Sequence, residues 1–187
     1  MFMTYKLTDI IKMKSGVFAK GDTNPDVYYI QSTDFDSYKK WVENLNPVLS
    51  VGPKLEKHIL KQGDILFAVK GREFFAVVYD GRYAPAVAST TFLVLQVKAK
   101  NILPEYVVWF LNHSKSQAIL WSMARGTAIS SITKSTLEQI EIPIPSVSKQ
   151  NSILEFSNLQ KKENQLQQQI IQLKQVYINE LTYKSIQ

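Results

Sequence analysis

Short apolar runs, each bounded by glycine, proline or charged residues, dominate the first hundred positions of the chain. The runs "DVYYIQSTDF", "GDILFAVKG", "EFFAVVYDG" and "STTFLVLQVKA" are rich in aromatic and β-branched residues, which is typical of β-strands. The opening run "YKLTDIIKMKSG" alternates between apolar and polar positions and stops at Ser15-Gly16. Lys70-Gly71-Arg72 separates two of the runs as a hairpin turn would. The pattern predicts a sheet of short, mostly antiparallel strands.

The apolar period lengthens after Leu103, where "LPEYVVWFLNHSKSQAILWSMA" has the spacing of an amphipathic helix. Pro104 suits the first turn of that helix, because its missing N–H has no intrahelical partner there. A short helix is expected over "TKSTLEQI", with Thr133 or Ser135 as N-cap, and Ser135 and Glu138 have the offset of a capping box. The next run, "IEIPIP", predicts an edge strand, because its prolines cannot donate to a ladder.

The segment after residue 145 predicts one long helix, capped by Ser146 or Ser148. Its apolar positions recur at spacings of three, seven, four, three and four residues, and Glu163 fills the gap of an a/d series. A helix of about 35 residues is about 50 Å long, whereas a domain of about 145 residues is roughly 30 to 35 Å across. We therefore expect a projecting coiled-coil helix that pairs with another helix, with a folded-back helical hairpin as the alternative. The residues expected to pair are Phe156, Leu159, Leu166, Ile170, Leu173 and Tyr177.

Composition changes at the same place as the period. All seven glycines, all seven prolines and all three tryptophans precede residue 146, whereas the remainder is rich in glutamine. The hydrophobic fraction of 45% is enough for a packed core. We therefore predict an α+β fold in two parts. Residues 1–145 form a domain with a twisted, mostly antiparallel sheet and several short helices, and residues 146–187 form the long C-terminal coiled-coil helix.

Candidate catalytic residues are scarce. The chain has no cysteine and only two histidines, His58 and His113, so disulfides, thiol nucleophiles and a zinc or iron site are not expected. Phosphate-binding GxxxxGK[ST] and nucleophile GxSxG motifs are absent, and the glycines in "KSGVFAKGD" and "VKGRE" are those of ordinary turns. No Asp or Glu stands two positions before a Lys, the spacing that one large class of metal-dependent nucleases requires. We therefore expect no enzymatic activity, no metal and no cofactor.

The charge balance is more informative about function than the search for catalytic residues. Twenty-two Lys and Arg against sixteen Asp and Glu leave a net charge of +6 and an isoelectric point near 9.3, which suits a polyanionic partner but is also found without one. Basic residues in expected loops can bind phosphate, and arginine can also read guanine. A solvated surface is the alternative for each of them. The candidates for DNA binding are Lys14, Lys20, Lys39, Lys40, Lys70, Arg72, Arg82, Arg125 and Lys134.

The opening of the chain lacks the charged and apolar regions of a secretory signal. No window approaches the roughly 20 apolar residues of a membrane span. We therefore expect a cytoplasmic protein that does not engage a membrane.

Several motifs, considered together, resemble one known family. "KLTDIIKMKSG" is similar to the segment that leads to the family's first glycine, and "LKQGDILFAVKG" to its Leu-x-x-Gly-Asp-Ile/Val-Leu strand. "YAPAVASTTFLVLQVKAKNILPEYVVWFLNHS" resembles its strand and Pro-x-Tyr helix. "RGTAISSITKSTLEQIEIPIPSVSKQNSI" resembles the closing signature, the most specific of the four, in which a glycine, small polar residues and a short helix precede Ile-x-Ile-Pro-x-Pro. These segments together resemble the target recognition domain of the specificity (S) subunit of type I restriction-modification systems.

The resemblance covers essentially the whole chain and implies a function. A non-catalytic subunit of this family recognises double-stranded DNA and directs a methyltransferase (M) subunit and a restriction and translocation (R) subunit to a split site. Thr127, Ser130 and Ser131 then become further DNA-binding candidates, because small residues let phosphates approach the backbone closely. The alternative function is a non-catalytic protein-interaction scaffold with an oligomerising helical stalk.

The chain departs from the family in length. S subunits usually carry two recognition domains, each followed by a long helix, whereas this sequence has one of each. It is either a natural half-length subunit or a shortened one, and Met1 favours the former. The resemblance therefore implies a homodimer through the C-terminal helix. Two identical domains would read about three to five base pairs each, in an interrupted palindrome that mirrors the protein's two-fold symmetry.

Overall fold

The computed structural model describes residues 3–42, 44–71, 73–124 and 130–186. Contacts divide the chain into two compact units, Met1–Val147 and Ser148–Gln187. The first unit contains every strand of the described residues together with the short helices, and the second contains all but the first residue of one long helix. The fold predicted from the sequence is therefore confirmed, while the functional division at residues 145 and 146 stays a prediction.

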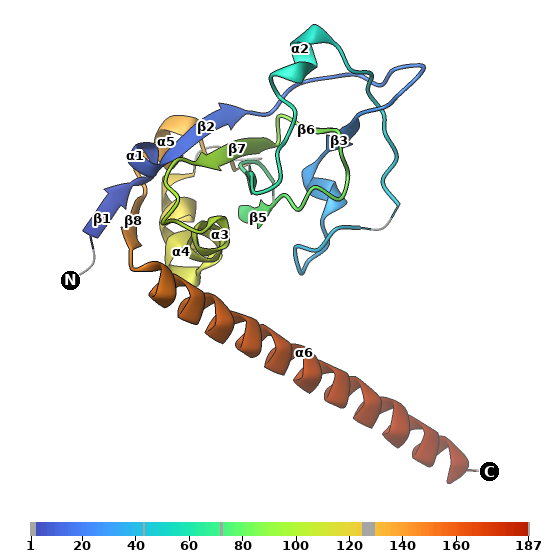
Figure 1. Cartoon of the computed structure of the whole chain (residues 1–187). Coiled ribbons are helices and arrows are strands. Elements are labelled where there is room, and N and C mark those ends of the chain that lie inside the picture. The colour runs from blue at the N-terminus through green and yellow to red at the C-terminus, as the bar shows by residue number, and fades with distance from the viewer. Residues whose placement is uncertain (1–2, 43, 72, 125–129, 187) are drawn as a thin grey trace. The chain divides into compact units, whose positions relative to one another are not determined.

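A four-stranded sheet forms the centre of the first unit (Figure 1). Its strands are β2 (Ile11–Ser15), β7 (Phe92–Val97), β4 (Ile65–Ala68) and β5 (Phe75–Val78), in that order. All three pairings are antiparallel, and the pair β4–β5 is the hairpin expected around Gly71. Every residue of β4 is buried, which explains its uninterrupted apolar sequence "ILFA".

Two smaller sheets complete the strands of the described residues. β1 (Met3–Lys6) pairs antiparallel with β8 (Glu141–Ile144), which has no other strand partner there, as expected of an edge strand. β3 (Tyr28–Ile30) pairs with β6 (Ala86–Ala88) in the parallel sense. The sheet is thus mostly antiparallel as predicted, but it is divided in three, and one pair runs parallel. Nothing in the local pattern of three-residue strands predicts their partner, because that choice is made by tertiary packing.

The alternation of the opening run suggested one strand, but the structure divides this run into three elements. A short helical turn, α1 (Leu7–Ile10), separates β1 from β2 and buries both of its terminal residues. The backbone N–H of Leu7 donates to the carbonyl of Ile140 at 2.9 Å. The run from Asp26 to Phe35 also ends early, because after β3 the chain enters the 3-10 helix η1 (Ser32–Asp34).

The expected amphipathic helix is divided into α3 (Pro104–Asn112) and α4 (Ser114–Met123). His113 between them has an extended backbone, and its ring Nδ1 accepts from the N–H of Lys115 at 3.3 Å, so it caps α4. The remaining short helices of the described part are α2 (Pro53–Glu56) and α5 (Lys134–Glu138). Thr133 is the N-cap of α5, since its Oγ1 accepts from Thr136 N–H at 3.1 Å, and the capping box proposed for Ser135 and Glu138 is wrong.

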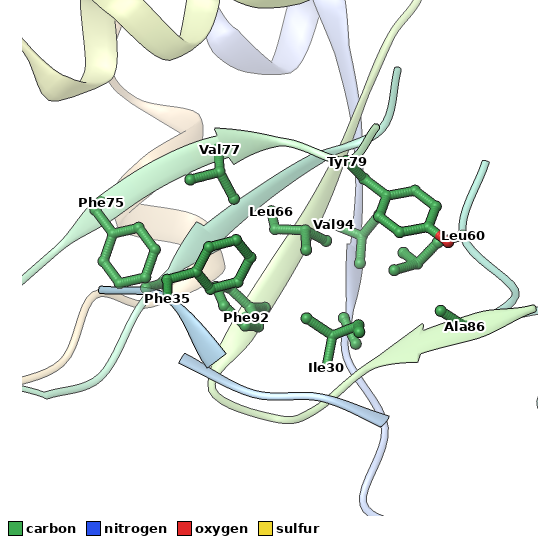
Figure 2. Close-up of a cluster of buried hydrophobic side chains, with 12 residues drawn as sticks. Ile30, Phe35, Leu60, Leu66, Phe75, Val77, Tyr79, Ala86, Phe92 and Val94 are labelled. Carbon is green, nitrogen blue, oxygen red and sulfur yellow. The ribbon is translucent and has the colours of Figure 1, made fainter. Parts of the chain in front are cut away.

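A core of aromatic and aliphatic side chains fills the space between the central sheet and the β3–β6 pair. Figure 2 shows the rings of Phe35, Phe75 and Phe92 gathered at one end of this core, with Tyr79 and Leu60 at the other. Phe35 lies edge-on to both other phenylalanines, with ring centroids 5.8 Å and 6.0 Å apart. This geometry is favourable for aromatic pairs and fixes the end of the sheet where β5 begins.

Two motif residues have structural roles. A Cβ on Gly16 would lie 1.9 Å from the carbonyl oxygen of Ser89, so only glycine fits beside that strand end. Gly63 has a φ of +90° in the turn before β4. The buried carboxylate of Asp64 accepts from the N–H of Lys61 at 3.0 Å and from Gln96 Nε2 at 2.9 Å. The Gly-Asp-Ile-Leu motif therefore builds a turn and anchors it to β7.

The second unit consists of the helix α6 (Val147–Lys184) from its second residue onward. This helix has 38 residues and, at 1.5 Å per residue, is about 57 Å long. It is uninterrupted, so the alternative of a helical hairpin is wrong. The six residues expected to pair with another helix are all exposed, with fractions from 51% to 71%. Within the described residues, no helix combines the length and the apolar character needed to cross a membrane.

Candidate nucleic-acid interface

The connection between β4 and β5 joins the closing motif of the sequence. Lys70 in this connection forms an antiparallel bridge with Ser131, although the two are 61 positions apart in the sequence. Next to the bridge, Ile132 N–H donates to the carbonyl of Val69 at 2.9 Å. The segment before α5 thus lies along the hairpin like a short additional strand. This pairing holds Ser131 beside an exposed lysine.

A third segment, around Lys39 in the first third of the sequence, contacts the same hairpin. The ammonium group of Lys39 contacts the carboxylate of Glu73 in an ion pair. The same ammonium lies 4.7 Å from the centroid of the Phe75 ring, where a cation–π interaction adds to the attraction. We call the surface around this connection the hairpin-tip surface. Contacts place Lys39, Lys70 and Ser131 on it, and we include the predicted residues within three positions of these in the sequence, which are Lys40, Ser130 and Lys134.

The two ion-paired lysines of the hairpin-tip surface differ in how readily they can exchange partners. Lys134 faces Glu138 at 3.7 Å, with the lysine side chain 49% exposed and the glutamate side chain 30% exposed. Lys39 is more enclosed, since its side chain is 27% exposed against 65% for Glu73. Exposed ion pairs contribute only about 0–1 kcal/mol to stability. A phosphate group can therefore replace a carboxylate as the partner of Lys134 at little cost.

The other predicted residues lie away from this surface. Lys14 is on β2, three strands from β5, and donates to the carbonyl of Lys57 at 3.5 Å. Lys20 is exposed in the loop between β2 and β3. Arg82, 3.6 Å from Asp80, follows the end of β5 opposite to the hairpin. Arg72, Arg125 and Thr127 lie outside the described residues.

A shallow hollow beside Lys14 is also lined by His58, Asp64 and Gln96. Burial lowers the pKa of His58, and the positive charges of Lys57 and Lys14 lower it further. The Asp64 carboxylate is held by hydrogen bonds to Lys61 and Gln96 and is not presented to the hollow as a free base. Among the residues that the structure describes, no group of three His, Cys, Asp or Glu side chains could hold a metal ion.

Sequence reasoning missed the residues that organise the hairpin-tip surface. Glu73 and Phe75 fix Lys39, but neither has a local signal that separates it from an ordinary strand residue. Asn112 has one: it ends a helix beside a histidine. Its side-chain amide donates to the carbonyl of Ala76 and its oxygen accepts from the N–H of the same residue, both at 2.8 Å. Asn112 therefore closes the free edge of β5 next to the hairpin.

Known proteins resemble this chain in sequence. The predicted type I restriction enzyme MjaX specificity subunit of Methanocaldococcus jannaschii is 27% identical over 165 residues. The match covers 82% of this chain and 39% of that relative. The chain thus spans about two fifths of the length of this curated relative.

Solved structures share the fold at low sequence identity. The type I restriction-modification S subunit from M. genitalium matches with a TM-score of 0.57 at 13% identity, over 86% of this chain and 39% of that chain. The HsdS subunit from Thermoanaerobacter tengcongensis matches with a TM-score of 0.56 at 13% identity, over 87% and 38%. The model of one family, the type I restriction modification DNA specificity domain, matches residues 1–175. The chain therefore belongs to the family of type I restriction modification DNA specificity domains.

Proposed function

We propose that the chain is a non-catalytic, sequence-specific recognition subunit for double-stranded DNA in a type I restriction-modification complex. The single observation that supports this function is the hairpin-tip surface, where three segments far apart in sequence bring lysines and small polar residues together. Lysine ammonium groups and backbone N–H groups are the donors that position proteins on phosphates. Family membership supplies the context in which such a surface meets duplex DNA.

The long helix gives the second half of the proposal, which is pairing. A helix whose apolar side chains at 156, 159, 166, 170, 173 and 177 are exposed needs a partner helix to bury them. In a parallel homodimer, Glu163 and Glu180 of the a/d series would each face the same residue of the other copy. An antiparallel pair avoids this repulsion and carries the two domains at opposite ends. The two domains then read the halves of an interrupted palindrome.

Catalysis is assigned to partners. The proposed complex contains an M subunit that binds the paired helices and methylates DNA, and an R subunit that cleaves it. In this arrangement the chain provides the sequence specificity, and α6 sets the distance between the two half-sites.

The test is DNA binding as a function of salt. Fluorescence anisotropy with a labelled duplex should give an affinity that falls steeply between 50 and 200 mM salt, since about 0.9 counterions are released per phosphate contact. Lys70→Ala should weaken binding to all sequences and lower the slope of log K against log salt by about 1. Lys100→Ala is the matched control, because Lys100 is exposed near the end of β7 away from the hairpin. A chain that retains no DNA at low salt would support the scaffold function instead.

A further inference from the structure

We propose that the turn from Asp36 to Lys40 is the base-reading element of the domain. Tyr38 and Lys40 would contact base edges, and Lys39 would act as a positioning residue. This inference rests on the proposed function, since it assigns the part of the DNA-binding surface that discriminates among sequences.

The turn is held by its own hydrogen bonds. Phe35 and Trp41 form an antiparallel bridge at its base. Asp36 N–H donates to the carbonyl of Lys40 at 2.8 Å, and Lys39 N–H donates to the carbonyl of Asp36 at 3.0 Å. The carboxylate oxygen Oδ1 of Asp36 accepts from the N–H groups of Tyr38 and Lys40, both at 2.8 Å. Five residues are thus fixed by four hydrogen bonds within the turn.

The base of the turn is part of the aromatic core. The rings of Phe35 and Trp41 lie 4.3 Å apart, and Phe35 packs against Phe75 and Phe92 (Figure 2). A rigid loop on a packed base loses little conformational entropy on binding, so its contacts can contribute to discrimination. Reading a base edge needs such positional precision more than contacting a phosphate does.

The side chains of Tyr38, Lys39 and Lys40 at the tip of the turn have two surroundings: Lys39 contacts the hairpin, whereas Tyr38 and Lys40 are exposed to solvent. Lys39 has a φ of +62°, a conformation that favours glycine, and the structure keeps a lysine there. Its ammonium contacts Glu73 and lies over Phe75, so it joins the turn to the hairpin. Tyr38 is 61% exposed and Lys40 is also exposed. The anchored lysine therefore holds its two neighbours outward.

Charge favours base contact over phosphate contact at this turn. Asp34, Asp36 and Glu73 stand around it against two lysines, so the local charge is not positive. The side of the hairpin-tip surface with Lys70, Ser131 and Lys134 has two lysines against one carboxylate, Glu138, so it is the more basic side and suits phosphates. Lysine donates to guanine O6 and N7, and tyrosine can donate, accept or stack. The two sides together place a phosphate contact next to a base contact.

The experiment is selection from a pool of randomised duplexes by the full chain, followed by affinity measurements on the selected and on unrelated duplexes. The variants are Tyr38→Ala and Lys40→Ala, with Lys100→Ala as the matched control. We expect both turn variants to relax the selected sequence at one or two neighbouring positions. They should lose about 5- to 100-fold of the preference for the selected duplex, while binding to unrelated duplexes changes less than about twofold.

Lys39→Gly tests the positioning role. Glycine keeps the left-handed backbone and removes the link to Glu73, so the turn should remain folded but lose discrimination. The expected result is the same relaxed sequence as for Tyr38→Ala, with an unchanged melting temperature. Glu73→Gln, which keeps a polar side chain but removes the ion pair, should give the same relaxation in weaker form.

The possible outcomes separate the two proposals. If the unmodified chain selects a sequence and both turn variants select the same one with equal preference, the base-reading turn is wrong and the proposed function stands. If the unmodified chain binds duplexes without selecting any sequence, specific recognition itself is wrong, and the turn is overturned with it. Equal losses for selected and unrelated duplexes would make Tyr38 and Lys40 phosphate contacts and also overturn the inference.

Discussion

Large apolar side chains are buried in the globular unit but exposed on α6. In the central sheet, Leu66 is 0% exposed and packs in the core with Phe92 and Val94. On α6, Leu166 is 51% exposed, and Phe156 and Leu173 are exposed to a larger extent. Burial of one such side chain is worth about 1.5–3 kcal/mol. The first unit has already gained this stabilisation, whereas α6 gains it only when it pairs.

The largest expected effect comes from charging the helix. Ile170→Glu combined with Leu173→Glu places two carboxylates in the a/d series next to Glu163 and Glu180. In the proposed homodimer each copy loses two apolar contacts and gains repulsion, so its dissociation constant should rise at least about 100-fold. Sedimentation equilibrium measures it. Gln172→Glu, outside the a/d series, is the matched control and should leave the dimer intact.

The second-largest expected effect comes from replacing a leucine by alanine in each unit and comparing the two variants. Leu66→Ala in the core should lower the free energy of unfolding by about 2–5 kcal/mol, because it leaves a cavity. Leu166→Ala should leave the unfolding of the globular unit unchanged and weaken the dimer instead. Urea denaturation followed by tryptophan fluorescence reports on the first unit alone, since all three tryptophans lie before residue 146. Equal destabilisation by both variants would mean that the two units unfold as one.

A pH dependence sharpens the description of the first unit. Burial, with the nearby charges of Asp80 and Asp64, raises the pKa of Tyr79 to about 12, and its hydroxyl donates to the carbonyl of Tyr83 at 2.5 Å. The unfolded state loses this proton near its ordinary pKa of about 10, whereas the folded state keeps it. The stabilisation is therefore complete below about pH 10 and falls by about 1.4 kcal/mol per pH unit between about pH 10 and 12. Denaturation at pH 9 and 11 should show this loss in the wild type, and Tyr79→Phe should reduce it.

The smallest effect concerns the hairpin-tip surface. Glu138→Gln removes the partner of Lys134 and should change the free energy of unfolding by less than about 0.5 kcal/mol. The released ammonium should bind phosphate more readily, so affinity for any duplex should rise severalfold at low salt. Anisotropy at two salt concentrations checks this, and an unchanged affinity would place Lys134 away from the DNA.

The sequence predicts these two units for different physical reasons. The apolar runs of β4, β5 and β7 and the long a/d series are strong periodic signals, and the structure has both. Local competition was harder to predict. The opening run alternates on both sides of Leu7–Ile10, yet this segment forms a helical turn that buries Leu7 and Ile10, three positions apart, on the same side. His113 divides a helix that periodicity alone would continue.

The candidate surface was predictable only in part. Loop lysines could be named from the sequence, but their grouping depends on the bridge between Lys70 and Ser131, which joins distant segments. The inward direction of Lys39 depends on a left-handed backbone that its residue type does not favour. Such tertiary contacts leave no periodic trace in a single sequence.

The most direct test of the account is the sequence that the unmodified chain selects from randomised duplexes. Two domains held apart by paired helices predict two inverted half-sites of about three to five base pairs each, separated by a constant gap whose sequence is free. Pooled sequences with such an interrupted palindrome would support both the reading surface and the pairing of α6. A single uninterrupted motif would contradict the pairing, and the absence of any enriched motif would contradict recognition itself.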